Sequence, residues 1–441
     1  MTTQDETTQP AYDAWQTTFF FSLASNDVSG TAVQVALDPN LPKGEALRQA
    51  AIAAAAELTA TLKADLDGVI AGNNSSPAPF LGAGDWTVVW GPQVLCLYPM
   101  LGSVKWAPYY TARFNATNAV FVVFSQQLGR YIAAIAATNF NSIYDWFAED
   151  FNVSSVVAWE GALQVWNGGA NTTAPSAGIP CISQATCTGV NQLLSMVDTV
   201  LTQKTLIGFL SGLTPAAGTT LTFTGHSLAG ALSPTLAMAC FDPAAGLLKG
   251  SGWTAAQAMI YPTAGATPGN ASFAALINGT GWAGASEKGN QPWQVWNTDI
   301  YNNVDVVPHA WGASTLEMIP EYYSVYYGPK VVALIQALVN VARDVASKGE
   351  AVAGPYTAIG SQALNPTGRS AAGDEFVYLY TIPATPGYQE YLTIPQAAET
   401  QPAPVSQTQV AWPDQALFQH TTAYSELILQ TPPQPVSVST D

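Results

Sequence analysis

The stretch Leu221-Thr-Phe-Thr-Gly-His-Ser-Leu-Ala-Gly-Ala-Leu232 decides the fold of this chain. A β-rich run ends at Gly225, and a helix-forming run of small residues begins after Ser227. A strand-to-helix turn this sharp strains the backbone of its central residue and exposes that side chain, so the residues two before and two after must be small. Gly225 and Ala229 meet this requirement, and the following helix directs free backbone N–H groups toward the same point. The sequence therefore predicts Ser227 as a nucleophile beside a site for an oxyanion.

The motif alone leaves a second interpretation open. Ala229 stands where the strict G-x-S-x-G pattern has its second glycine, and Gly230 follows it. On its own, the pentapeptide also fits a serine that opens an ordinary helix after a glycine turn. The rest of the chain has to separate the two interpretations.

Composition and charge exclude several classes of protein. The chain has 441 residues, enough for a large core, and a net charge of -17 from 30 acidic and 13 basic side chains. Because no cluster of lysine and arginine interrupts this acidity, nucleic-acid binding and docking to anionic membranes are disfavoured. The N-terminus lacks the pattern of a secretory signal, and no apolar run reaches the roughly 18 residues of a transmembrane segment. We expect a soluble protein, cytoplasmic or exported by another route.

Metal and cofactor motifs do not occur in the sequence. It contains no H-E-x-x-H, no phosphate-binding loop and no G-x-G-x-x-G, so neither a metal nor a cofactor is predicted. Cys181 and Cys187 bracket a short loop and can pair in an oxidising compartment. Cys240 is predicted to be a buried thiol.

Strands alternate with helices along most of the chain. We expect an amphipathic helix over 44–66, a β-hairpin from 119–125 and 130–136, further strands near 86–90, 94–97, 221–225, 258–261, 294–301 and 376–382, and helices over 190–201, 271–276 and 329–348. This alternation predicts a mainly parallel sheet with helices on both faces. The ligand site should then lie where the parallel strands end.

Two levels of organisation follow from this pattern. Residues 1–110 are predicted to form an N-terminal arm and helix that pack on the core, with residues 1–40 mostly extended. Residues 111–441 form the main domain. Within it, the loop-rich stretch 151–189 is predicted to be a lid, with a passive surface excursion as the alternative, and 320–350 to be a helical insertion.

A serine hydroxyl becomes a useful nucleophile when an imidazole takes its proton and a carboxylate orients that imidazole. The chain contains three histidines. The side chain of His226 should diverge from Ser227, and His309 follows the candidate acid Asp305 so closely that a joint contact is difficult. His420 remains as the predicted base.

The acid is predicted to be Asp305. It follows a strand in a turn that Pro308 ends, where a carboxylate can project over the edge of the sheet. Asp299, inside the preceding strand, is the main alternative, and Asp305 also fits the role of a solvated turn residue. The resulting order Ser227, Asp305, His420 is the order used on the α/β-hydrolase fold.

Four segments of the chain resemble the class 3 lipases, the fungal-lipase-like branch of the α/β hydrolases, as a divergent member of bacterial type. They are the turn at 223–232, the Gly-Asn-ended loop at 262–270, the N-x-x-D-x-V-P segment at 302–308, and the hairpin into Ala136-Ala-Thr138 with Asp145-Trp146. His420 matches the family through its C-terminal position and the following Tyr424. The family's Arg-Gly before the threonine is Ala136-Ala137 here.

The resemblance implies an α/β-hydrolase fold with cap or lid insertions, and an ester hydrolase with a Ser/His/Asp triad. It also implies an oxyanion hole formed by Leu228 and Thr138. We therefore expect a lipase-like serine carboxylic-ester hydrolase, a triacylglycerol lipase or esterase, that acts on ester or lipid substrates and contacts lipid aggregates at their interface. A feruloyl or polyester-type esterase with the same triad is the alternative, and a catalytically inactive hydrolase-fold binding protein is a third interpretation.

Overall fold

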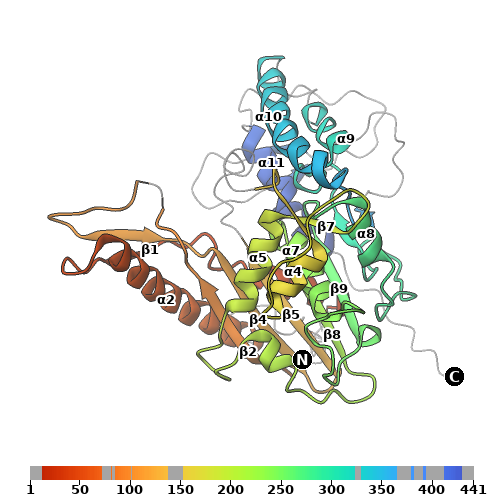
Figure 1. The fold of residues 1–441 in the computed structure, drawn as a ribbon, viewed down its shortest axis with the longest axis horizontal. Coiled ribbons are helices and arrows are strands. Elements are labelled where there is room, and N and C mark those ends of the chain that lie inside the picture. Colours follow the sequence, from red (N-terminus) through yellow and green to blue (C-terminus); the bar gives the residue numbers. More distant parts are fainter. Residues whose placement is uncertain are drawn as a thin grey trace, which may run out of the picture.

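The computed structural model describes residues 12–71, 81, 85–100, 102–137, 152–322, 329–364, 379–381, 391–393 and 412–429. Within these residues the largest sheet has seven strands in the order β11-β10-β9-β8-β5-β4-β2 (Figure 1). The strands are β2 (Trp86–Leu95), β4 (Asn118–Ser125), β5 (Arg130–Ala137), β8 (Thr220–His226), β9 (Ala258–Thr263), β10 (Asp299–Tyr301) and β11 (Ser361–Ala363). The five strands from β5 to β11 are parallel, and β4 runs antiparallel between β2 and β5. The predicted mainly parallel sheet is confirmed.

The register of the central strands brings their carboxyl ends together. The predicted hairpin is present, with Ser125 opposite Arg130 and Asn118 opposite Ala137. In the parallel pair β5·β8, Ile135 lies opposite Gly225, so both strands end at the same edge of the sheet. The residues that follow β5 and β8 therefore start from neighbouring positions.

One face of the sheet is covered by helices that share the largest apolar cluster. These helices are α4 (Trp159–Trp166), α5 (Gln184–Ser195), α6 (Leu206–Leu210), α7 (Leu228–Phe241) and α8 (Ala271–Asn278). Along β4, Val120 and Val122 point into this cluster, whereas Phe121 and Val123 point into another. The alternation is the period of two that a strand with both faces covered requires.

The other face carries α1 (Ala14–Ala24) and α2 (Lys43–Ala71). The extended arm predicted for residues 1–40 is wrong at α1, which packs on β5, β8 and β9. A capping box starts α1: Asp13 accepts from the backbone of Gln16, whose side chain accepts from the backbone of Asp13. The sequence does not predict this helix because Thr18 and Ser22 lie on its buried side beside the phenylalanines. The buried positions are therefore not all apolar, and the helical spacing of apolar residues is lost.

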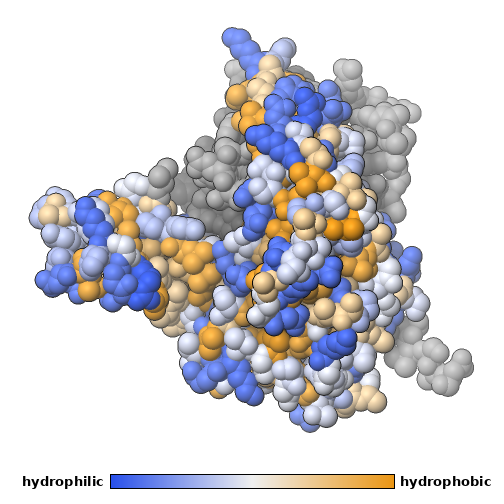
Figure 2. All heavy atoms as spheres, in the orientation of Figure 1, coloured by the Kyte–Doolittle hydropathy of each residue, from blue (hydrophilic) through white to orange (hydrophobic). Residues whose placement is uncertain are grey.

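A projecting arm extends from this face of the molecule (Figure 1). It consists of α2 and the antiparallel pair β1 (Val33–Ala36) and β3 (Thr111–Phe114). Helix α2 continues through Gly68 to Ala71 instead of ending near residue 66 as predicted. Hydrophilic residues predominate at the outer end of the arm in Figure 2, and apolar ones gather where it meets the rest of the molecule.

Residues 152–189 are more regular than the predicted loop. They contain α4 and the antiparallel pair β6 (Val156–Ala158) and β7 (Cys181–Ser183), and α5 begins at Gln184 instead of residue 190. Trp159 and Ile182 are buried in the same cluster as the central strands. The Trp159 indole N–H donates to Asp242 at 2.9 Å. A lid that moved as a unit would have to withdraw these side chains from the core.

Four other elements differ in their boundaries from the prediction. The runs at 86–90 and 94–97 are one strand, β2, with register shifts between Val88 and Gln93. The strand predicted over 294–301 is reduced to β10, because residues 291–298 form turns with buried tryptophans. Helix α10 (Pro329–Ala353) continues past Gly349, and the strand predicted at 376–382 is described only as β12 (Leu379–Thr381), paired with β13 (Tyr391–Thr393).

The C-terminal elements surround the loop that follows β10. They are the 3-10 turns Val307–His309 and Ile319–Glu321, helices α9 (Ala313–Leu316), α10, α11 (Trp412–His420) and α12 (Thr422–Tyr424), and the π-turn Ser425–Leu429. Val304 and Val306 of the loop share one apolar cluster with α10 and with Trp412 and Ala416 of α11. This packing holds α11 against the loop that contains Asp305. Within the residues that the structure describes, no helix is both long enough and apolar enough to cross a membrane.

Candidate active site

The turn between β8 and α7 has the strained geometry that the sequence predicts. Ser227 is a non-glycine residue with φ 65° and ψ -129°. Such a conformation costs about 1–3 kcal/mol and persists where the surroundings fix it. Here the Ser227 N–H donates to the Thr263 carbonyl at 3.0 Å, and its own carbonyl accepts from Gly230 at 2.8 Å.

The turn requires small residues because other backbone segments lie very close to it. A Cβ on Gly225 would lie 2.5 Å from the Ala229 carbonyl oxygen. A Cβ on Gly230 would lie 2.6 Å from the Thr263 carbonyl oxygen and 2.7 Å from the Cα of Gly265. The glycine after Ala229 is therefore the one that seats α7 against the end of β9, so the departure from the strict motif does not loosen the turn.

We expect Gly230→Ala to destabilise the protein by about 1–3 kcal/mol, because the added methyl meets backbone atoms that cannot move aside. Gly68→Ala is the matched control, since it adds the same methyl in α2 with no atom within 4 Å. That change should stabilise the helix by about 0.5–1 kcal/mol. Urea unfolding of both variants measures the two effects, and equal midpoints would contradict the packing argument.

Asp305 and His420 are in direct contact. His420 Nδ1 lies 2.8 Å from Asp305 Oδ2, and both side chains are fully buried. Because a carboxylate oxygen only accepts, the proton of this bond lies on His420 Nδ1. The two residues are 115 positions apart in sequence, and the packing of α11 on the acid loop brings them together.

Two further donors fix the carboxylate of Asp305. Its Oδ1 accepts from the Val307 N–H at 3.0 Å, and its Oδ2 also accepts from the Tyr424 hydroxyl at 2.8 Å. The Tyr424 oxygen in turn accepts from the Asn302 N–H at 2.8 Å. Burial, and next the charge of Asp305, raise the pKa of Tyr424 well above its ordinary value, so the hydroxyl keeps its proton and donates.

The alternative acid, Asp299, has a different partner. Its Oδ1 accepts from the Gly265 N–H at 3.1 Å. Burial, and then the charge of Asp305, raise the pKa of Asp299 well above its ordinary value. A buried carboxyl group whose charged form is disfavoured is a poor partner for an imidazolium.

The other two histidines are also buried. His309 Nε2 lies 2.8 Å from the Tyr322 hydroxyl, and burial lowers its pKa. His226 Nδ1 lies 2.8 Å from Thr263 Oγ1, and its Nε2 lies 2.6 Å from the backbone carbonyl oxygen of His420. The rings of His226 and His420 are 4.9 Å apart between centroids. His420 is therefore tied to the residue that directly precedes Ser227.

The predicted oxyanion donors are only partly described. Leu228 is the first residue of α7, where a backbone N–H has no partner within the helix. Thr138, together with Asp145 and Trp146, lies outside the described residues. Ser227 Oγ is fully buried, and within the described chain it makes no hydrogen bond.

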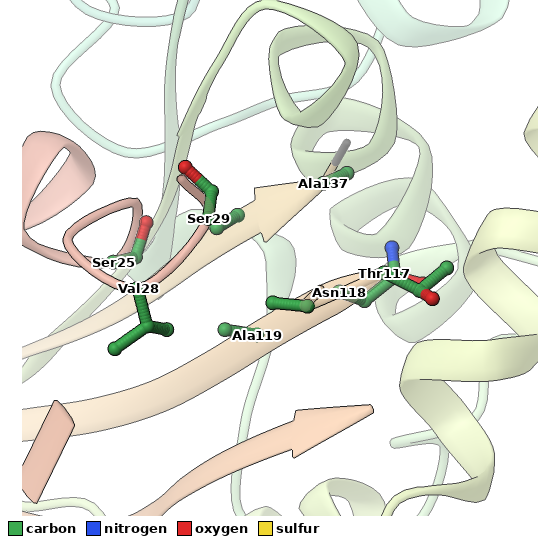
Figure 3. Close-up of a pocket in the computed structure, with 9 residues that line it drawn as sticks. Ser25, Val28, Ser29, Thr117, Asn118, Ala119 and Ala137 are labelled. Atoms are coloured by element: carbon green, nitrogen blue, oxygen red, sulfur yellow. The ribbon is translucent and has the colours of Figure 1, made fainter. Parts of the chain in front are cut away.

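A small pocket opens near the end of β5, on the side of α1 (Figure 3). Its lining combines the turn after α1 with the facing ends of β4 and β5, namely Ser25, Val28, Ser29, Ala116, Thr117, Asn118, Ala119, Ala136 and Ala137. Asn118 Oδ1 is buried there without a hydrogen-bond partner among the described residues. Ala137 is the last residue before the predicted Thr138, so the pocket adjoins the edge of the sheet where the site lies.

The cysteines are unpaired in this structure. Cys181 and Cys187 are both free, so the pairing considered from their spacing is not present. Burial raises the pKa of Cys187 to about 11. Cys240 is a buried thiol in α7 as predicted, and burial raises its pKa as well. Among the residues that the structure describes, no group of three or more His, Cys, Asp or Glu is arranged to hold a metal ion.

Several contacts at the site are not apparent from the sequence. The motifs single out Asp305 and His420, but they do not reveal that Thr263 and the carbonyl of His420 both bind His226. Asn302 also donates to Gln419 Oε1 at 2.6 Å, which adds a second link between the acid loop and α11. The only sequence feature that points to this link is Gln419, directly before His420, and it is a weak indication because the chain is rich in Gln.

Comparison with known proteins supports the fold. No family model and no curated protein matches the sequence. The sheet order, the strained turn and the covering helices define the α/β-hydrolase fold, and among solved structures the M37 lipase shares it. The two are 23% identical with a TM-score of 0.56, over 95% of this chain and 92% of that one.

Fungal lipases are more distant neighbours. Rhizomucor miehei triacylglyceride lipase is 14% identical over 52% of this chain and 62% of its own, with a TM-score of 0.32. Lipase II from Rhizopus niveus is 13% identical over 65% and 79%, with a TM-score of 0.34.

Proposed function

We propose that the protein is a serine carboxylic-ester hydrolase of the lipase type, with Ser227 as nucleophile, His420 as general base and Asp305 as the acid that orients it. The observation that carries the proposal is the buried 2.8 Å bond between His420 Nδ1 and Asp305 Oδ2, tied through His226 to the strained turn of Ser227. An imidazole oriented by a carboxylate beside a strained serine is what acyl transfer through a serine requires.

The proposed reaction has two acyl-transfer steps. Ser227 Oγ attacks the ester carbonyl carbon while its proton passes to His420, and Asp305 stabilises the imidazolium that forms. The tetrahedral oxyanion accepts hydrogen bonds from the N–H groups of Leu228 and Thr138. His420 then gives its proton to the leaving alcohol, and water repeats the sequence on the acyl-enzyme. Loss of one oxyanion donor costs about 3–4 kcal/mol of transition-state stabilisation in related chemistry.

Covalent labelling tests the proposal directly. A fluorophosphonate should react with the protein and leave its phosphonyl group on Ser227, located by mass spectrometry of the digested protein. A catalytically inactive binding protein with the same fold should not react at this serine. Labelling at another residue, or none under conditions that label a known serine esterase, would exclude the proposed nucleophile.

We propose esters of apolar acyl chains as the substrate class. Ser227 and His420 are both fully buried, so an ester of any kind reaches them only if the site opens. The choice of apolar acyl chains follows the name of the M37 lipase, which shares the fold.

A chain-length series measures this preference. With p-nitrophenyl esters from butyrate to palmitate, kcat/KM should rise or hold toward the longer chains. A feruloyl or polyester-type esterase with the same triad should instead turn over short or aromatic esters best, and an optimum confined to C2–C4 would count against a lipase.

Contact with lipid aggregates is the remaining part of the proposal. If the buried site opens at an interface, the rate on tributyrin should increase more steeply above the solubility limit of the substrate than below it. A single hyperbolic curve across that limit would contradict interfacial contact while leaving ester hydrolysis intact.

A further inference from the structure

His226 is a buried polar side chain beside the proposed base. Its side chain is 1% exposed and has Phe19 of α1 against its ring, with centroids 6.3 Å apart. Both ring nitrogens have oxygen partners, the Thr263 hydroxyl and the backbone carbonyl of His420. The proposed reaction uses neither nitrogen, so this buried histidine needs another explanation.

The partners determine where the proton of His226 lies. A backbone carbonyl only accepts, so the 2.6 Å bond to His420 requires a proton on Nε2. Nδ1 of a neutral ring then accepts the hydroxyl proton of Thr263. Burial, and next the charge of His420, lower the pKa of His226 well below its ordinary value, which agrees with this neutral form.

The carbonyl that His226 binds lies at the end of a helix. His420 is the last residue of α11, and the final carbonyls of a helix lack partners within it. The next residue, Thr421, has φ -122° and ψ -77°, so α11 ends at His420. The 2.6 Å bond from His226 gives this carbonyl a donor from another part of the chain and fixes the point from which the imidazole of His420 extends.

We propose that His226 is a positioning residue, which locks the backbone of His420 to the end of β9 and thereby sets the imidazole against Ser227. This inference rests on the proposed function, because it assigns a role toward the same triad. His226 is next to the nucleophile in sequence and bonded to the base in space, so one residue fixes the distance between the two. The bond to Asp305 holds Nδ1 of the imidazole but does not fix the backbone of His420.

The test compares His226→Leu with His226→Gln. Leucine fills the space and removes the donor, whereas glutamine can place its amide N–H near the original Nε2 position. With p-nitrophenyl butyrate, His226→Leu should lower kcat by about 100-fold, the typical cost of a small misplacement in a reacting geometry, with KM within about threefold. His226→Gln should recover most of the loss. Thr263→Val, which removes only the hydroxyl donor to Nδ1, should give a smaller loss in kcat.

His309→Gln is the matched control, since His309 is also buried but bonds to Tyr322 and not to His420. Its kcat should stay within about threefold of the wild type. Thermal unfolding of all variants identifies any that fail to fold. A folded His226→Leu with wild-type kcat, or a His226→Gln no better than the leucine variant, would overturn the proposal.

A readout without substrate keeps this inference separate from the proposed function. The chain has three histidines, so protein labelled with ¹⁵N-histidine gives few imidazole signals. The Nδ1 proton of His420, bonded to Asp305, should resonate far downfield in the wild type and in His226→Gln, and should broaden or vanish in His226→Leu. If the signal is unchanged in the wild type and in both variants, His226 does not position His420. If the signal is lost only in His226→Leu but the wild type has no esterase activity, only the proposed function is rejected.

Discussion

Ser227→Ala is expected to abolish ester turnover, with kcat/KM for p-nitrophenyl esters reduced about 10⁶-fold, as for serine knockouts in other triads. The change removes one oxygen atom that is fully buried and bonded to no described residue, so the fold has no interaction to lose. Alanine is no more strained than serine at φ 65°, which leaves the turn in place.

Ser233→Ala is the matched control for this variant. Ser233 is also a fully buried serine in the same region, on α7, and its hydroxyl likewise has no partner among the described residues. Removing an unsatisfied hydroxyl costs little or stabilises. Turnover by Ser233→Ala should match the wild type, and substantial turnover by purified Ser227→Ala would refute the proposed nucleophile.

Asp305→Asn is the second change with a large expected effect, a fall of about 10⁴-fold in kcat. The amide cannot accept from Nδ1 of His420 and the Tyr424 hydroxyl as the carboxylate does. An amide that rotates its NH₂ toward His420 forces the proton of the imidazole onto Nε2, which then cannot accept from the nucleophile. The carboxylate of aspartate and the amide of asparagine have nearly the same size, so the packing around position 305 changes little.

The control for this variant is Asp299→Asn, which also tests the alternative acid. Burial raises the pKa of Asp299 well above its ordinary value and so disfavours its charged form, and asparagine can still accept from the Gly265 N–H. Steady-state kinetics should show activity within a few fold of the wild type for Asp299→Asn. If the two variants exchanged these outcomes, the acid would be Asp299.

The parts of the site that the sequence predicts are those with strict local requirements. The turn at Ser227 needs small residues at fixed offsets, and the close contacts of Gly225 and Gly230 show why. His420 is the predicted base because only three histidines exist and two have sequence neighbours that disfavour the role. Loop 302–308 and α11 meet through long-range packing, which no local pattern encodes.

The parts that were missed depend on tertiary burial. Helix α1 puts Gln16 and Thr18 on its buried side, where Gln16 Nε2 donates to the Ile428 carbonyl at 2.8 Å, so its apolar residues do not follow a helical period. Residues 152–189 read as a loop because glycine, proline and threonine are frequent, yet Trp159 anchors a buried helix there. In both cases a contact from another part of the chain overrides local preference.

The link between Gln16 and Ile428 joins the first described helix to the last turn of the described chain. The proposed base, His420, belongs to the segment 412–429 that this contact holds in place. Loosening of α1, although it contains none of the proposed catalytic residues, would therefore also release the support of the base.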